Sequence, residues 1–110
     1  MNDLAEKKCK VCKGDAAVIT MQEAFDLLSG ITGWELLPSG KEICRKFSFK
    51  NFNHTMAFVN AVALIANQEG HHPDLEVGYN YCRIRYSTHA VNGLTENDFI
   101  CAAKINSLGS

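Results

Sequence analysis

The sequence predicts an α+β fold, a two-layer sandwich in which an antiparallel sheet of about four strands carries three helices on one face. Two observations lead to this prediction. Three segments combine helical spacing of apolar residues with capping or stop residues at their ends, and four segments are typical of strands, three of which alternate apolar and polar residues. Along the chain these segments follow the order α-β-β-α-β-β-α, which favours helices packed on one side of an antiparallel sheet.

The first helix is predicted to begin at Thr20, because Thr20 and Glu23 have the spacing of a capping box. Gly30 is placed to stop this helix, since glycine readily adopts the conformation that ends helices. Its apolar side comprises Ala24, Phe25, Leu27 and Leu28.

A hairpin is predicted next, with strands at residues 34–37 and 43–49 joined through a turn that contains proline and glycine. Arg45 falls on the apolar face of the second strand. We expect its aliphatic stem to pack there while the guanidinium reaches the edge. The other residues of that face are Ile43, Phe47 and Phe49.

The longest helix is predicted for residues 53–69, where apolar residues recur at helical spacing along one broad stripe. Gly70 is well placed as its C-terminal cap. Pro73 forbids continuation, because proline lacks the N–H donor and clashes with the preceding turn. The stripe consists of Thr55, Phe58, Val59, Val62, Ile65 and Ala66.

A short and a longer strand follow this helix, separated by a turn at residues 78–80. Leu75 and Val77 alternate in the short strand. The longer one alternates at Cys82, Ile84, Tyr86 and Thr88.

The last helix is predicted to begin at Thr95, with Asp98 as the carboxylate of its capping box. Leu94 and Phe99 have the spacing of a hydrophobic staple around this start. Its buried side comprises Cys101, Ala102, Ile105 and Leu108.

Length and charge bound the domain organisation and the partners. The 110 residues suit one domain, which we expect at 18–110 after a polar, loosely held leader at 1–17. A net charge of -1 gives no basic footprint for nucleic acid or anionic lipid. The sequence has no apolar run long enough to span a membrane and no signal-peptide pattern, so a cytoplasmic location is expected.

Cysteine usage favours a reducing compartment. Of the five cysteines, Cys44, Cys82 and Cys101 each sit in an apolar segment and are expected to be small buried hydrophobes. Cys9 and Cys12 form a C-x-x-C pair, which is half of a zinc or redox site. No second pair at zinc-finger spacing follows, so an inert or merely oxidisable pair is favoured over a metal site.

The histidines carry the strongest chemical signal. His71 and His72 directly follow the long helix, where the helix dipole favours the imidazolium form, and Pro73 restricts the direction of His72. Such a fixed pair suits general acid–base chemistry, although a solvated turn or an adventitious metal site fits the spacing equally well. His89 ends the fourth strand and is expected to meet the pair, while His54 is expected at the surface.

These residues resemble the pattern of the pterin-4a-carbinolamine dehydratases. The family pattern of His-His-Pro, an aromatic residue, a histidine and an aspartate is matched by His71-His72-Pro73, Tyr79, His89 and Asp98. The resemblance covers roughly residues 18–108. It departs from the pattern at Asn67 and Ala90, where family members usually or often carry charged residues that could pair with an imidazole.

The resemblance implies dehydration of a 4a-hydroxy-tetrahydropterin to the quinonoid dihydropterin, without metal or organic cofactor. This reaction recycles the pterin of an aromatic amino acid hydroxylase. The family implies catalytic roles for His71 and His89 in proton transfer, and for His72 in orienting the pterin. It implies substrate binding by His72, Pro73, Tyr79 and Asp98, and assembly into homodimers or homotetramers.

A different class of function fits the same resemblance. The family fold also serves as a dimerisation cofactor of a homeodomain transcription factor and assists Rubisco assembly. Such an interaction module would use oligomer surfaces and would not need all three histidines of the pattern, so their retention favours the enzyme. A metal site that joins Cys9, Cys12 and the histidine pair is a third, less favoured hypothesis.

Overall fold

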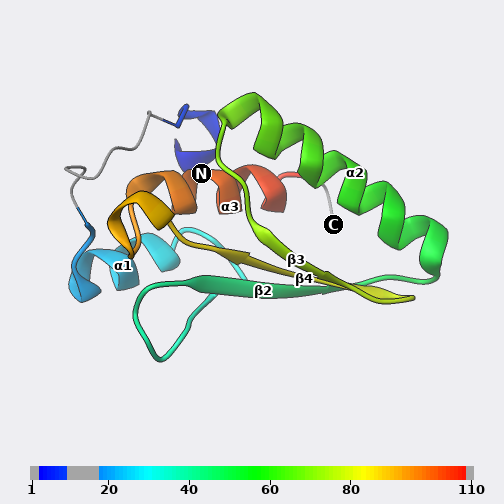
Figure 1. Cartoon of the computed structure of the whole chain (residues 1–110), viewed down its shortest axis with the longest axis horizontal. Helices are drawn as coiled ribbons and strands as arrows, with labels where there is room; N and C mark the ends of the chain where they lie inside the picture. The colour runs from blue at the N-terminus through cyan, green and yellow to red at the C-terminus, as the bar shows by residue number, and fades with distance from the viewer. Residues whose placement is uncertain (1–2, 10–17, 109–110) are drawn as a thin grey trace.

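A four-stranded antiparallel sheet lies below the helices in the computed structural model, which describes residues 3–9 and 18–108 (Figure 1). The helices cover one face of the sheet, and the predicted α+β sandwich is confirmed. In chain order the elements are η1 (Asp3–Glu6), α1 (Met21–Leu28), β1 (Glu35–Leu36), β2 (Ile43–Ser48), α2 (Phe52–Glu69), β3 (Asp74–Val77), β4 (Tyr81–Tyr86), η2 (His89–Val91) and α3 (Glu96–Asn106).

The sheet has the strand order β1-β2-β4-β3, so β2 and β4 form its centre. Arg45 pairs with Ile84 in this register and therefore lies on the apolar face, as predicted. Its guanidinium carbon lies 4.3 Å from the centre of the Phe47 ring, and Nη1 donates to the carbonyl of Thr32 at 2.7 Å. The charge is thus held at the edge of the core while the stem is packed.

Helix α2 is fixed at both ends by its own sequence. The side chain of Asn51 accepts the backbone N–H of His54 at 3.0 Å, and Gly70 ends the helix in the left-handed conformation at φ 65°. The predicted stripe faces the core, with Thr55, Phe58, Val62 and Ala66 buried. Within the described ranges, neither α2 nor any other helix has the length and apolar character that crossing a bilayer requires.

Three expectations about the elements were wrong in detail. Phe25 is exposed, because the eight-residue α1 turns Ala24 rather than Phe25 toward the core. Leu108 is also exposed, because α3 ends at Asn106 and the residues beyond it leave the helix face. The fourth strand stops at Tyr86, and Thr88 instead bridges Gly93 across the turn that contains η2.

The first residues of the expected leader are packed, which corrects that expectation for residues 3–9. Leu4 is buried, and Lys104 of α3 donates from Nζ to the carbonyl of Ala5 at 2.8 Å. The backbone N–H of Cys9 donates to Oε1 of Glu69 at 2.8 Å. This N-terminal segment is therefore tied to both α2 and α3, while residues 10–17 lie outside the described part of the chain.

Candidate functional site

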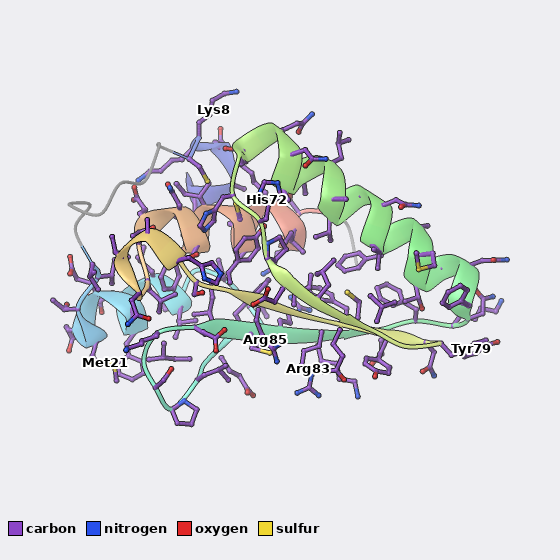
Figure 2. The ribbon with its side chains drawn as sticks, viewed as in Figure 1. Lys8, Met21, His72, Tyr79, Arg83 and Arg85 are labelled. Atoms are coloured by element: carbon purple, nitrogen blue, oxygen red, sulfur yellow. The ribbon has the colours of Figure 1, made fainter. Side chains whose placement is uncertain are left out.

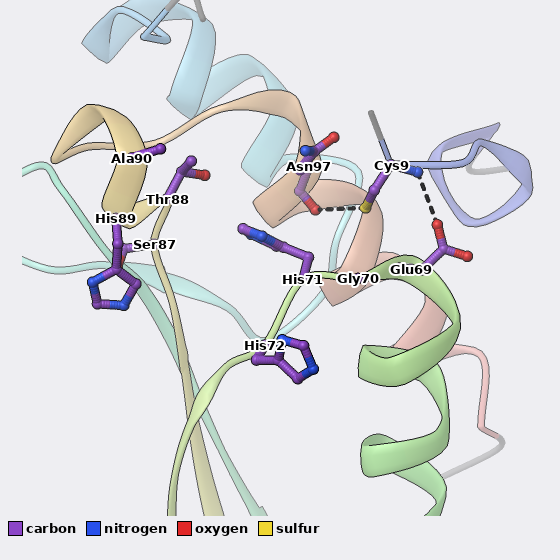
Figure 3. A pocket seen from close by; sticks show the side chains of 10 residues that line it. All are labelled: Cys9, Glu69, Gly70, His71, His72, Ser87, Thr88, His89, Ala90 and Asn97. Atoms are coloured by element: carbon purple, nitrogen blue, oxygen red, sulfur yellow. Dashed lines mark hydrogen bonds between the residues drawn. The ribbon is translucent and has the colours of Figure 1, made fainter. Parts of the chain in front are cut away.

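A pocket of about 410 Å³ opens between the end of α2, the end of β4 and the start of α3 (Figure 3). Its wall contains His71, His72 and His89, which the sequence predicts as one site. Residues from separate elements thus line one pocket. The complete lining is Cys9, Glu69, Gly70, His71, His72, Ser87, Thr88, His89, Ala90 and Asn97.

His71 is aimed by the chain reversal that ends α2. The left-handed Gly70 turns the backbone, and the N–H of His71 still donates to the carbonyl of Ala66 at 3.1 Å. The imidazole stacks on Tyr86, with ring centres 5.3 Å apart and planes 16° apart. The hydroxyl of Tyr86 donates to the backbone carbonyl of His71 at 3.3 Å, so both ring and backbone are held.

Asp98 holds the other side of the His71 ring. Nε2 of His71 lies 2.6 Å from Oδ1 of Asp98, which is fully buried. Oδ2 of Asp98 accepts the hydroxyl of Thr88 at 2.8 Å and the backbone N–H of Thr95 at 3.0 Å. The predicted capping role is confirmed, and the same carboxylate also binds His71.

The electrostatics of His71 favour its protonated form. Burial is the largest single influence and disfavours the charge, but the hydrogen bond and the negative charge of Asp98 outweigh it. The pKa of His71 is therefore raised above its ordinary value of 6.5. At neutral pH, the protonated fraction of His71 is therefore larger than that of an ordinary histidine.

His72 lies at the pocket wall with its ring exposed. Its Nε2 lies 3.3 Å from Oδ1 of Asn67, one turn back in α2. The residue that departs from the family pattern thus supplies a neutral hydrogen-bond partner in place of a charge. Pro73 leads from His72 into β3 but does not line the pocket.

His89 reaches the same pocket from η2, beyond the end of β4. Its side chain is exposed and makes no hydrogen bond within the part of the chain that the structure describes. Ala90 follows it in the wall and brings no charge. His71 and His89 therefore differ in chemistry, because one is paired with a carboxylate and the other is open to the pocket.

Three expected substrate contacts, Pro73, Tyr79 and Asp98, are not brought to the pocket within this chain. Tyr79 is 66% exposed at the tip of the β3–β4 hairpin, at the opposite end of the strands from His72 (Figure 2). About six extended residues separate the two, which corresponds to roughly 20 Å. Asp98 does not line the pocket either, because it is buried behind His71 and acts through that ring.

Sequence reasoning missed two parts of the site. Thr88 was expected only as an alternating strand residue, yet its hydroxyl binds Asp98. Cys9 was expected in a loosely held leader, yet it lines the pocket, and its Sγ lies 3.5 Å from Sγ of Cys101. No spacing along the chain signals this second contact, because the two cysteines are 92 residues apart.

No metal site emerges from the described residues, since no group of three histidine, cysteine, aspartate or glutamate side chains there could hold an ion. Cys12, the second residue of the C-x-x-C pair, lies outside them. His54 is exposed near the start of α2, with Nδ1 2.8 Å from Oδ1 of Asn51, and takes no part in the pocket.

Comparisons with known proteins agree on one family. Residues 17–108 match the family model described as pterin 4 alpha carbinolamine dehydratase. A relative from Legionella pneumophila (strain Corby), named "Putative pterin-4-alpha-carbinolamine dehydratase", is 57% identical over 97% of this chain and 96% of its own. A relative of the same name from Nitrosospira multiformis is 54% identical over 98% of this chain and 94% of its own.

Solved structures show the same fold. A crystal structure from Brucella melitensis, described as a transcriptional coactivator/pterin dehydratase, is 32% identical with a TM-score of 0.82. It covers 86% of this chain and 100% of the other. A pterin dehydratase-like protein described as a RuBisCO assembly factor in the alpha-carboxysome is 26% identical with a TM-score of 0.62, over 71% of this chain and 92% of its own.

Proposed function

Because this chain belongs to the pterin-4-alpha-carbinolamine dehydratase family, we propose that it dehydrates 4a-hydroxy-tetrahydropterin to the quinonoid dihydropterin. The observation that carries the proposal is the pocket in which His71, paired with the buried Asp98, faces the same space as His72 and His89. This arrangement supplies a held proton donor and an open imidazole, which are the two groups that an elimination of water needs.

The reaction requires two proton transfers. Hydroxide is a poor leaving group, so the 4a-hydroxyl must gain a proton as its C–O bond breaks. A ring N–H of the pterin must lose its proton so that the new double bond can form. Neither transfer changes an oxidation state, so imidazole groups suffice and we propose no metal or organic cofactor.

His71 is the proposed acid. Its Nε2 is engaged by Asp98, so Nδ1 is the ring nitrogen left to donate a proton to the leaving hydroxyl. Asp98 raises the pKa of His71 and so keeps more of it protonated near neutral pH. Thr88 fixes the carboxylate and thereby the ring, which makes Thr88 and Asp98 positioning residues.

His89 is the proposed base, because its ring carries no carboxylate partner in the described part of the chain and opens to the pocket. His72 orients the pterin, with its own ring directed by Asn67. Positioned acid–base groups of this kind typically contribute ~10²–10⁴-fold in rate. We further propose that the product is reduced again in the cytoplasm to serve an aromatic amino acid hydroxylase, and that the protein is a homodimer or homotetramer.

A second function is favoured by a specific finding, namely that one structural relative is described as a transcriptional coactivator as well as a pterin dehydratase, and another as a RuBisCO assembly factor. An interaction module on this fold would use the outer surface of an oligomer and would tolerate loss of the pocket histidines. The two functions make opposite predictions for pocket variants, so the same proteins test both.

The test measures dehydration of freshly generated 4a-hydroxy-tetrahydropterin by absorbance, against the spontaneous rate. The wild-type protein is expected to accelerate the reaction, and His71→Ala and His89→Ala are each expected to lose ~10²–10⁴-fold. His54→Ala is the matched control, because His54 is an exposed histidine outside the pocket. If the folded wild-type protein does not accelerate the reaction, the proposed dehydratase activity is refuted and the interaction module is favoured.

A further inference from the structure

Cys9 in the pocket wall and Cys101 behind it form a close thiol pair. Their sulfur atoms lie 3.5 Å apart. Sγ of Cys9 also lies 3.7 Å from the backbone carbonyl oxygen of Asn97 (Figure 3). Cys101 is completely buried in α3, whereas Cys9 is half-buried and lines the pocket. Cys9 is therefore accessible from solvent. Among the described cysteines, Cys9 is the one whose sulfur lies close to that of Cys101.

The structure holds these sulfurs together before any bond forms. The backbone of Cys9 is bound to Glu69 at 2.8 Å, and the residues before it are anchored by Lys104 and by buried Leu4. A disulfide needs a sulfur separation of about 2.05 Å, so an approach of roughly 1.5 Å completes it. Because the two thiols are already positioned, the pair behaves as if at high effective concentration, which favours an intramolecular disulfide over a mixed one.

We propose that Cys9 and Cys101 are a redox modification site, at which exchange with a low-molecular-weight disulfide forms a reversible Cys9–Cys101 bond that fastens the N-terminal segment to α3 at the pocket wall. This inference is independent of the proposed dehydratase reaction. It assigns a function to Cys9 of the C-x-x-C pair, a residue that the proposed acid–base chemistry does not use.

The exchange balances in two steps. The hydrogen bond to Cys101 raises the pKa of the Cys9 thiol, so Cys9 reacts once it has lost its proton. Its sulfur then attacks one sulfur of the small disulfide, forms a mixed disulfide and expels one thiolate. The Cys101 thiolate then attacks the Cys9 sulfur, closes the protein disulfide and expels the second thiolate. The two protons given up by the cysteines go to the two expelled thiolates, so two protein thiols are oxidised and one small disulfide is reduced to two thiols.

The bond would change the site in two ways. It draws the Cys9 sulfur from the pocket wall toward α3, so the lining loses a thiol. It also links residues 92 positions apart, which removes much of the freedom of the unfolded chain. The N-terminal segment then cannot leave the pocket wall without breaking the disulfide.

The test equilibrates the full-length protein in glutathione buffers with a rising share of oxidised glutathione. Free thiols are then blocked with iodoacetamide under denaturing conditions, and digested peptides are identified by mass spectrometry. We expect a cross-linked Cys9–Cys101 peptide and a Tm raised by at least ~5 °C in the oxidised protein. Cys101→Ser should abolish both effects and leave glutathione on Cys9, and Cys9→Ser should abolish both without touching the core.

Cys82→Ser is the matched control, because Cys82 is completely buried in β4 and lies outside the Cys9–Cys101 pair. This variant is expected to keep the cross-link and its Tm shift. Recovery of Cys9 bonded to Cys12, or of Cys101 still alkylated in the most oxidising buffer, would overturn the proposal.

Discussion

Replacing Asp98 by asparagine tests the pairing that defines the site. The buried carboxylate accepts two hydrogen bonds at Oδ2, from Thr88 and Thr95, and one contact at Oδ1, from His71. Asparagine has nearly the same shape but only one oxygen. If this oxygen stays with Thr88 and Thr95, the amide nitrogen faces Nε2 of His71, which must then accept a hydrogen bond as a neutral ring.

The expected cost follows from the charge that is lost. A hydrogen bond to a charged group contributes about 1.5–3 kcal/mol, so we expect Asp98→Asn to lower the free energy of unfolding by about 2 kcal/mol at mildly acidic pH. Without the carboxylate, burial is opposed by the weaker influence of Cys101, and the pKa of His71 should fall below its ordinary value of 6.5.

The loss should depend on pH with a definite sign. The pKa of His71 is raised in the folded protein, so its contribution is fully present below the unfolded-state value of 6.5. It disappears as the pH rises through the raised folded-state pKa. Each unit of difference in pKa between wild type and variant corresponds to about 1.4 kcal/mol on the acidic side.

The assay combines urea unfolding on both sides of neutrality with an NMR titration of the His71 ring. Asp26→Asn is the matched control, since Asp26 is exposed on α1 and its loss should cost no more than about 0.5 kcal/mol. A destabilisation by Asp98→Asn that is the same at acidic and alkaline pH would refute the charged pair. An unchanged His71 titration would refute it independently.

Three further changes probe the parts that hold the site. Thr88→Val keeps the shape of the side chain but removes the hydroxyl that donates to Asp98, so we expect the free energy of unfolding in denaturant to fall by about 1.5–3 kcal/mol. Thr32→Val, at an exposed position, should cost almost nothing, and equal losses for the two variants would contradict the hydrogen-bond network. Gly70→Ala meets no atom within 4 Å but must adopt a left-handed backbone, so a cost of about 1–2 kcal/mol is expected in thermal unfolding, and a neutral result would argue against that conformation. Tyr79→Ala should leave KM for the pterin unchanged in steady-state assays, because Tyr79 is exposed far from the pocket of its own chain; a raised KM would instead indicate that Tyr79 of a second copy reaches the site.

Much of the fold could be predicted because its signals are local. The capping pair of Thr20 and Glu23, the glycine that ends α2 and the alternation in β2 each act within a few residues. The position of Arg45 followed from the same alternation. Exposure of Phe25 could not be predicted in this way, since helical spacing identifies an apolar side but not whether a short helix buries all of it.

The same distinction between local and long-range signals applies to the candidate site. Adjacency and a following proline are enough to single out His71 and His72, because these features are written in consecutive residues. The partner of the His71 ring is not indicated by consecutive residues. Asp98 lies 27 residues away along the chain and reaches His71 through the reversal at Gly70 and the start of α3.

By itself the sequence determined the elements, their order, the apolar faces and the residue types that can move protons, because backbone preferences and side-chain periodicity act over one or two turns of chain. Only the tertiary structure decided which of these residues meet. Strand direction carries Tyr79 away from the pocket, helix packing buries Asp98 behind His71, and the N-terminal segment brings Cys9 to Cys101. The physical reason is that such contacts depend on the packing of whole elements, which no short stretch of the chain encodes.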